Sequence, residues 1–165
     1  MRRLALALAC LAAGPVFAQG LEGREVVFRA LAYEDREAPV FVGRDRIATV
    51  GPGPEYGMGP EGPQNGWDIV PAIVDISDDR VLIRYPALGP SGTFPDVAFN
   101  GYLLDFLTDC VLFAGAAPTA NTVPPMAPDE VFVEGATLFI DVGGRPYGPD
   151  AVIEIALDVL DCPMS

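Results

Sequence analysis

The sequence predicts an all-β protein: an antiparallel β-sandwich, jelly-roll-like, with one disulfide. Its apolar stretches are short and recur about every 8 to 15 residues as about eight to ten candidate strands. Turns rich in glycine and proline, which number 18 and 17 in the chain, separate them. No part of the mature chain shows a long apolar period of 3.6 residues, so no long helix is expected. Many short strands with regular turn signals are typical of sandwiches and jelly rolls.

The first strand is expected at Glu25–Tyr33, the apolar run EVVFRALAY. A helix is the alternative for its second half, but a strand agrees better with the β pattern of the rest of the chain. A charged turn follows at residues 34–37. Residues 40–42 and 46–50 then predict one or two short strands, which are broken at Gly43.

Residues 51–66 hold the highest density of glycine and proline, at ten of sixteen positions. This composition predicts a loop without helix or strand pairing, and loops of this length are usually functional or mobile. Tyr56 and Met58 are the sizeable apolar groups that it presents. Two interpretations stay open, a binding loop and a mobile surface excursion.

Two hairpins are expected further along the chain. The first joins residues 67–77 to residues 80–85, and its second arm alternates apolar and polar side chains, as a strand with one face in water does. Pro71 indicates that the first arm is an edge strand or is bulged near its start. The second hairpin spans residues 130–142 and turns at Gly135.

Residues 99–115 form the densest apolar run of the mature chain, carry Cys110, and are expected to hold the central strand. Residues 151–161 alternate most cleanly and predict a half-buried last strand, which Cys162 follows directly. An even pair of cysteines in an exported protein indicates a disulfide. A Cys110–Cys162 bond would close a loop of about 50 residues and contribute about 4 kcal/mol in the chain-entropy model.

Residues 1–18 predict a secretory signal peptide. Arg2 and Arg3 supply the positive start, an apolar core follows, and Val16-Phe17-Ala18 is a small-x-small cleavage site. We therefore expect one domain over residues 19–165 in a secreted or periplasmic protein. No later stretch reaches the 18 or so apolar residues of a membrane-spanning helix.

The mature chain is strongly acidic and contains neither lysine nor histidine. Eight arginines remain against 23 acidic residues, a net charge of about −15. Nucleic acid and anionic lipid surfaces are therefore not expected as partners. The missing imidazole and amine groups exclude a serine–histidine triad, a P-loop, Schiff-base chemistry and histidine-ligated metals. Solvation explains the acidity, and cation binding or a basic partner are the alternatives.

Two sets of residues are candidate sites. Asp75, Asp78 and Asp79 surround the first hairpin turn and are candidate calcium ligands, although adjacent aspartates are also ordinary turn residues. No other cofactor is expected. Trp67, Tyr56 and Tyr147 are candidate ligand-binding residues, together with Phe94. If their loops gather at one end of the sandwich, the rings form a stacking surface for a sugar; otherwise Trp67 caps the core.

No catalytic residue is assigned. Glycoside hydrolysis needs two carboxyl groups about 5 to 9.5 Å apart. Glu154 and Asp158 share one strand but are four residues apart, about 13 Å. A pair of carboxylates from two strands stays open.

Three runs carry a family resemblance: Phe99-Asn100-Gly101-Tyr102 entering a strand, residues 138–142 before the last strand, and Val50-Gly51-Pro52-Gly53-Pro54-Glu55. They resemble a β-sandwich segment of uncharacterised exported bacterial proteins that bear a sorting signal. The resemblance covers most of residues 47–160 and implies fold and export, with no catalytic residues to transfer. The chain shows no C-terminal sorting helix or arginine cluster, so surface anchoring by that route is not expected.

Taken together, these features predict an exported, soluble β-sandwich that acts as a binding or interaction module. Its ligand is open, and a carbohydrate or a protein is the candidate partner. One alternative is a carboxylate-dependent polysaccharide hydrolase. Another is a periplasmic inhibitor whose acidic surface engages a basic enzyme. The oligomeric state is also open.

Overall fold

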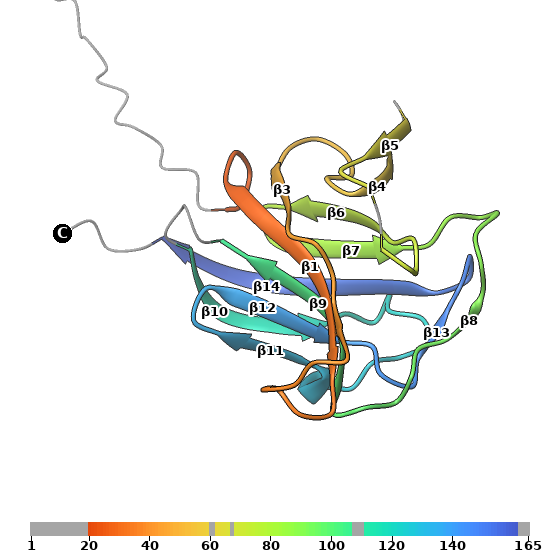
Figure 1. Cartoon of the computed structure of the whole chain (residues 1–165). Helices are drawn as coiled ribbons and strands as arrows, with labels where there is room; N and C mark the ends of the chain where they lie inside the picture. Colours follow the sequence, from red (N-terminus) through yellow and green to blue (C-terminus); the bar gives the residue numbers. More distant parts are fainter. Residues whose placement is uncertain (1–19, 60–61, 67, 107–110, 162–165) are drawn as a thin grey trace, which may run out of the picture.

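The computed structural model describes residues 20–59, 62–66, 68–106 and 111–161. These residues form an all-β structure with antiparallel strand pairing throughout (Figure 1). The helical element in this part of the chain is the single 3-10 turn η1 (Pro128–Glu130). No helix among the described residues has the length and apolar character needed to cross a membrane.

Two main sheets and two short ladders make up the fold. The larger sheet has the order β11-β12-β9-β1. The other edge of β1 pairs with two short strands, first with β3 and then, near the end of β1, with β2. The second sheet has the order β10-β14-β7-β6, and the ladders are β4–β5 and β8–β13. The strands are β1 (Glu25–Tyr33), β2 (Phe41–Val42), β3 (Arg46–Thr49), β4 (Gly57–Gly59), β5 (Gly62–Gln64), β6 (Ile73–Ser77), β7 (Arg80–Arg84), β8 (Gly92–Thr93), β9 (Phe99–Asp105), β10 (Val111–Pro118), β11 (Val131–Glu134), β12 (Thr137–Asp141), β13 (Pro146–Tyr147) and β14 (Val152–Asp161).

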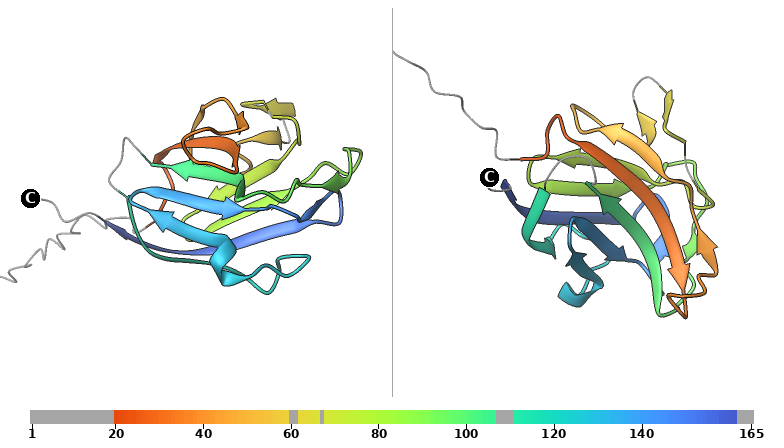
Figure 2. Two further views of the ribbon diagram at one scale, coloured as in Figure 1. Left: turned by 60° about the horizontal axis from the view of Figure 1, so that its bottom comes forward. Right: turned by 60° about the vertical axis from the view of Figure 1, so that its left-hand side comes forward.

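Both main sheets contribute to one hydrophobic core, because alternate side chains of each strand point to the same face. Val26 and Phe28 enter this core from β1, and Ile153 and Ile155 enter it from β14. Figure 2 shows β1 beside β9 and β14 beside β7, the long strand pairs that carry these residues. Burial of each such side chain contributes about 1.5 to 3 kcal/mol, so the shared core is the main source of stability.

A smaller cluster lies on the opposite face of the larger sheet. Phe99, Leu103 and Phe139 are each at most 4% exposed. The guanidinium of Arg36 lies 5.6 Å from the centre of the Phe139 ring and also pairs with Glu134. The Arg36 side chain therefore covers part of this outer face. Strand alternation alone did not predict buried apolar side chains there.

The hairpins and the terminal strands agree with the sequence patterns. β6 and β7 pair through a turn at Asp78 and Asp79, and β11 and β12 pair across Gly135. β14 buries Ile153, Ile155 and Leu157 on one face, as its alternation predicts. The first strand is β throughout, so the helical alternative for its second half is wrong.

The expectation for residues 51–66 needs correction, because part of this stretch is ordered β structure. Residues 57–59 and 62–64 form the β4–β5 ladder, and Tyr56 is 1% exposed in the main core. The Tyr56 hydroxyl donates to the Val26 carbonyl at 3.0 Å. Gly57 has φ +89°, and a Cβ there would lie 2.2 Å from the Ala72 carbonyl oxygen. Glycine thus permits both the turn and the close approach to the neighbouring backbone.

The central stretch also differs from its prediction, since residues 99–115 contribute two strands to two different sheets. β9 lies in the middle of the larger sheet, and β10 is an outer strand of the second sheet. β10 pairs with β14, with Val111 opposite Asp161. Cys110 and Cys162, and with them the predicted disulfide, lie outside the described residues.

Glu55 is a buried carboxylate, 5% exposed, at the start of this ordered part of the glycine- and proline-rich stretch. Its two carboxylate oxygens accept hydrogen bonds from the backbone N–H of Gly51 at 3.0 Å and of Ile76 at 2.7 Å. Burial raises the pKa of Glu55 despite these hydrogen bonds. The folded protein therefore holds this proton to a higher pH than the unfolded chain does.

We predict a pH-dependent effect of Glu55→Gln on the free energy of unfolding. As the pH rises from the unfolded carboxyl pKa of about 4.3 through the raised native pKa, the native protein loses stability relative to the variant, because the folded state binds the proton more tightly. Urea unfolding of both proteins between about pH 4 and 8 measures the difference. Exposed Glu37→Gln controls for the change in net charge. Parallel pH curves for native protein and Glu55→Gln would contradict the prediction.

Candidate ligand pocket

The short strands β8 and β13 pair at the side of the molecule away from the C-terminal end of β14 (Figure 1). Four aromatic side chains gather beside this pair. The rings of Phe94 and Tyr147 are 4.9 Å apart between centroids. Tyr85 lies 6.4 Å from Phe94 and 6.3 Å from Tyr147, and Tyr102 meets Phe94 edge-on at 6.3 Å. Contacts of this geometry stabilise aromatic clusters beyond simple burial.

The phenol groups of Tyr85 and Tyr102 are uncharged at neutral pH. The hydroxyls of Tyr85 and Tyr102 are buried and lie 3.4 Å apart. Burial raises the pKa of Tyr85 to about 12 and raises the pKa of Tyr102 well above its ordinary value. This end of the core is therefore apolar with neutral hydrogen-bonding groups.

A cavity of about 530 Å³ adjoins the cluster. Phe94, Tyr102 and Tyr147 form part of its wall, and the inward side chains Ala30 and Ala32 of β1 leave it open. Earlier positions on the same face of β1 carry Val26 and Phe28, which fill the core. The space therefore opens where the side chains of β1 become small.

The rim of the cavity is apolar and exposed. Val40 is 70% exposed and Ile69 is 80% exposed, and both line the cavity. Large apolar side chains at the mouth of an apolar cavity are typical of ligand-binding sites.

One charged side chain, Asp68, is found among the described residues that line the cavity. Its Oδ1 accepts a hydrogen bond from Nη2 of Arg46 at 2.8 Å, and both side chains are 14% exposed. The partly buried carboxylate is therefore ion-paired through Oδ1, whereas its buried Oδ2 has no hydrogen-bond partner among the described residues.

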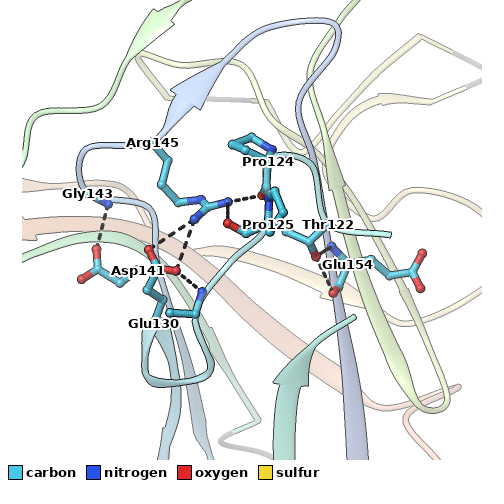
Figure 3. Close-up of polar contacts among 9 residues, drawn as sticks. Thr122, Pro124, Pro125, Glu130, Asp141, Gly143, Arg145 and Glu154 are labelled. Atoms are coloured by element: carbon cyan, nitrogen blue, oxygen red, sulfur yellow. Dashed lines mark hydrogen bonds and ion pairs between the residues drawn. The ribbon is translucent and has the colours of Figure 1, made fainter. Parts of the chain in front are cut away.

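Arg145, two residues before Tyr147 in the chain, makes polar contacts with Glu130, Pro124 and Pro125 (Figure 3). Its side chain is 10% exposed, and Nη1 lies 3.2 Å from Oε2 of Glu130. Nη2 donates to the carbonyls of Pro124 and Pro125, the latter at 3.2 Å. The Arg145 carbonyl accepts from the Phe94 N–H at 2.9 Å. One residue thus connects the 124–130 segment to the backbone of Phe94, and it lies two positions before Tyr147 in the chain.

Two further polar contacts fix the neighbouring segments (Figure 3). The Thr122 hydroxyl donates to the Glu154 carbonyl at 2.9 Å and accepts from the Glu154 N–H at 3.0 Å. Oδ1 of Asp141 accepts from the N–H of Gly143 at 2.9 Å and of Asn100 at 3.1 Å. These bonds satisfy backbone groups that leave the sheet ladders near the cavity.

The structure separates the aromatic residues that the sequence singled out. Tyr147 and Phe94 come together at the cavity, whereas Tyr56 is a core residue stacked on Phe28 at 4.9 Å between ring centroids. Tyr56 therefore does not lie on an exposed loop surface, because its ring completes the core beside β1. Trp67 lies outside the described residues, and its neighbour Asp68 lines the cavity.

The three aspartates proposed as calcium ligands have separate roles in the structure. Asp75 lies on β6, Oδ1 of Asp78 accepts from the Glu22 N–H at 2.9 Å, and the Asp79 carbonyl accepts from the Leu157 N–H at 2.7 Å. Across the parts of the chain that the structure describes, no three acidic or cysteine side chains come together as a metal-binding group. Calcium binding stays a prediction.

Sequence reasoning missed Ala30, Ala32 and Arg145. The signal for the two alanines was present, since apolar β1 changes from large to small residues along one face. Nothing in the sequence near Arg145 distinguished it from a solvent-exposed arginine, because its acceptors come from a segment about 20 residues away.

Comparison with protein-family models, with curated proteins and with solved structures finds no match to this chain.

We predict that Arg145→Ala lowers the free energy of unfolding by about 1 to 3 kcal/mol, because it leaves partly buried carbonyls and the Glu130 carboxylate without their donor. Chemical denaturation measures the loss. Arg84→Ala, at an exposed position on β7, is the matched control and should cost less. Equal losses for the two variants would mean that the Arg145 contacts contribute nothing specific.

Proposed function

We propose that this protein is an exported binding module whose ligand occupies the cavity beside Phe94 and Tyr147. The observation that carries the proposal is an open volume of about 530 Å³ between aromatic walls, with an exposed apolar rim. This volume falls within the range of about 300 to 1,000 Å³ that is usual for small-molecule sites.

The lining supports an apolar ligand better than a sugar. A carbohydrate presents many hydroxyl groups, and each one that enters an apolar wall without a partner loses its hydrogen bonds to water. Glycoside hydrolysis would need two carboxyl groups, whereas the described lining contains the single carboxylate of Asp68, which pairs with Arg46. Binding without turnover is therefore our first hypothesis.

We also propose that the protein is exported and that Cys110 and Cys162 form a disulfide. The sequence of residues 1–18 supports secretion. The pairing of Val111 with Asp161 supports a Cys110–Cys162 bond, because each cysteine is the sequence neighbour of one member of this pair. Directly opposed residues of antiparallel strands are about 4.5 to 5.5 Å apart between Cα atoms, within the range that a disulfide spans.

We classify the domain as a jelly-roll-like β-sandwich. Support comes from two main antiparallel sheets whose side chains meet in one core. β9 and β10 follow one another in the chain but belong to different sheets, which is the connection expected of such a sandwich.

The first test uses N-phenyl-1-naphthylamine, an uncharged apolar dye that fluoresces on leaving water. We expect saturable binding, and a loss of affinity of at least about tenfold in Ala32→Leu, since the larger side chain occupies the cavity. Ala156→Leu, at an exposed position on β14, should bind as the native protein does. Circular dichroism checks folding, and Ala30→Val is the second cavity variant. Unchanged affinity in both folded cavity variants would overturn the proposed site.

The second test concerns the disulfide. Thiol titration of the purified denatured protein should find no free thiol after signal removal, and one in Cys110→Ser. The variant should lose about 2 to 5 kcal/mol of stability, because the unfolded chain is no longer cross-linked. Two free thiols in the native protein would show that the bond does not form.

A further inference from the structure

A second hollow adjoins the proposed pocket. It has a volume of about 440 Å³ and lies between the segment after β7 and the segment before β6. Ile69 lines both the inner cavity and this outer hollow. The two spaces therefore meet at one exposed apolar side chain.

The outer hollow is apolar and open to solvent. Leu88 is fully exposed and Met58 is 45% exposed, and both line it with Ile69. Its other described lining residues are glycine and prolines, so no charged side chain is among them. Exposed apolar groups cost free energy in water, so their concentration at one place indicates a surface that is covered in use.

Tyr147, like Ile69, also lines a further hollow. Ser91 and Asp150 are among its lining residues. A charged side chain, Asp150, thus lines the hollow beside Tyr147, whereas no charged side chain is among the described lining residues of the hollow beside Ile69.

Resting on the proposed function, we propose that the ligand is an uncharged molecule with a long hydrocarbon chain. One part of the chain fills the inner cavity, and the rest crosses Ile69 into the outer hollow against Leu88 and Met58. Two adjoining apolar spaces fit an extended chain better than a compact ring, which would fill the inner cavity alone.

The electrostatics favour an uncharged head group. The chain has a formal net charge of −13, so an anionic group at the rim is repelled. A cationic group finds no carboxylate in the described lining of the outer hollow, and the Asp68 carboxylate of the inner cavity already forms an ion pair with Arg46 through Oδ1, although its buried Oδ2 accepts no hydrogen bond. A hydroxyl or similar neutral head can remain in water at the mouth.

The experiment measures displacement of N-phenyl-1-naphthylamine by 1-hexanol, 1-octanol, 1-decanol and 1-dodecanol. In the native protein we expect affinity to rise about fourfold with each methylene through dodecanol, as continued apolar burial requires. Leu88→Ser should leave hexanol affinity unchanged and weaken dodecanol binding about tenfold. Leu160→Ser, another exposed leucine on β14 at 49% exposure, is the matched control and should change neither. Decanoate at pH 7 should bind more weakly than decanol.

The outcomes separate this inference from the proposed function. If affinity stops rising at short chains and Leu88→Ser has no effect, the ligand is confined to the inner cavity and the inference is wrong, while the proposed function stands. Tighter binding of decanoate than of decanol would overturn the uncharged head group. If neither dye nor alcohol binds, the proposed pocket itself is overturned. Met58→Ser repeats the test at a second residue of the outer hollow.

Discussion

The apolar contact between the inner faces of the two main sheets is the interaction on which the rest of the structure depends. Side chains such as Phe28 of β1 and Ile155 of β14 are removed from water in the same core. This contact explains why apolar and polar side chains alternate along the strands. Residues from neighbouring segments also pack into the same core. Tyr56 joins the core from a stretch rich in glycine and proline, and its hydroxyl bonds to β1 instead of remaining unpaired.

The candidate pocket lies where this contact ends. Along the inner face of β1 the side chains shorten from Val26 and Phe28 to Ala30 and Ala32, so the core is no longer filled by the strand itself. Phe94 and Tyr147 enclose the space from two segments that pair as β8 and β13. The inner face of β1 therefore contributes to both the core and the proposed pocket. Side chains fill the space beside Val26 and Phe28, and the space beside Ala30 and Ala32 is open.

Polar contacts position this open end. Arg145 connects the backbone next to Phe94 and Tyr147 to a distant segment through Glu130 and two proline carbonyls. A planar guanidinium can satisfy several acceptors at once, which suits it to fix loops that carry no regular ladder. The net acidic charge of the chain affects which ligands approach, since an anion is repelled before it reaches the rim.

The sequence by itself determined the strands and hairpins, because alternation, glycine and proline act on neighbours in the chain. β1, the β6–β7 and β11–β12 hairpins and β14 lie where their patterns predicted. The tertiary structure alone decided that residues 99–115 divide between two sheets, that Tyr56 is core, and that Tyr147 and Phe94 meet at the cavity that Ala32 also lines. These outcomes depend on contacts between segments tens of residues apart, whose burial free energy outweighs the local preference of a glycine-rich stretch for a loop.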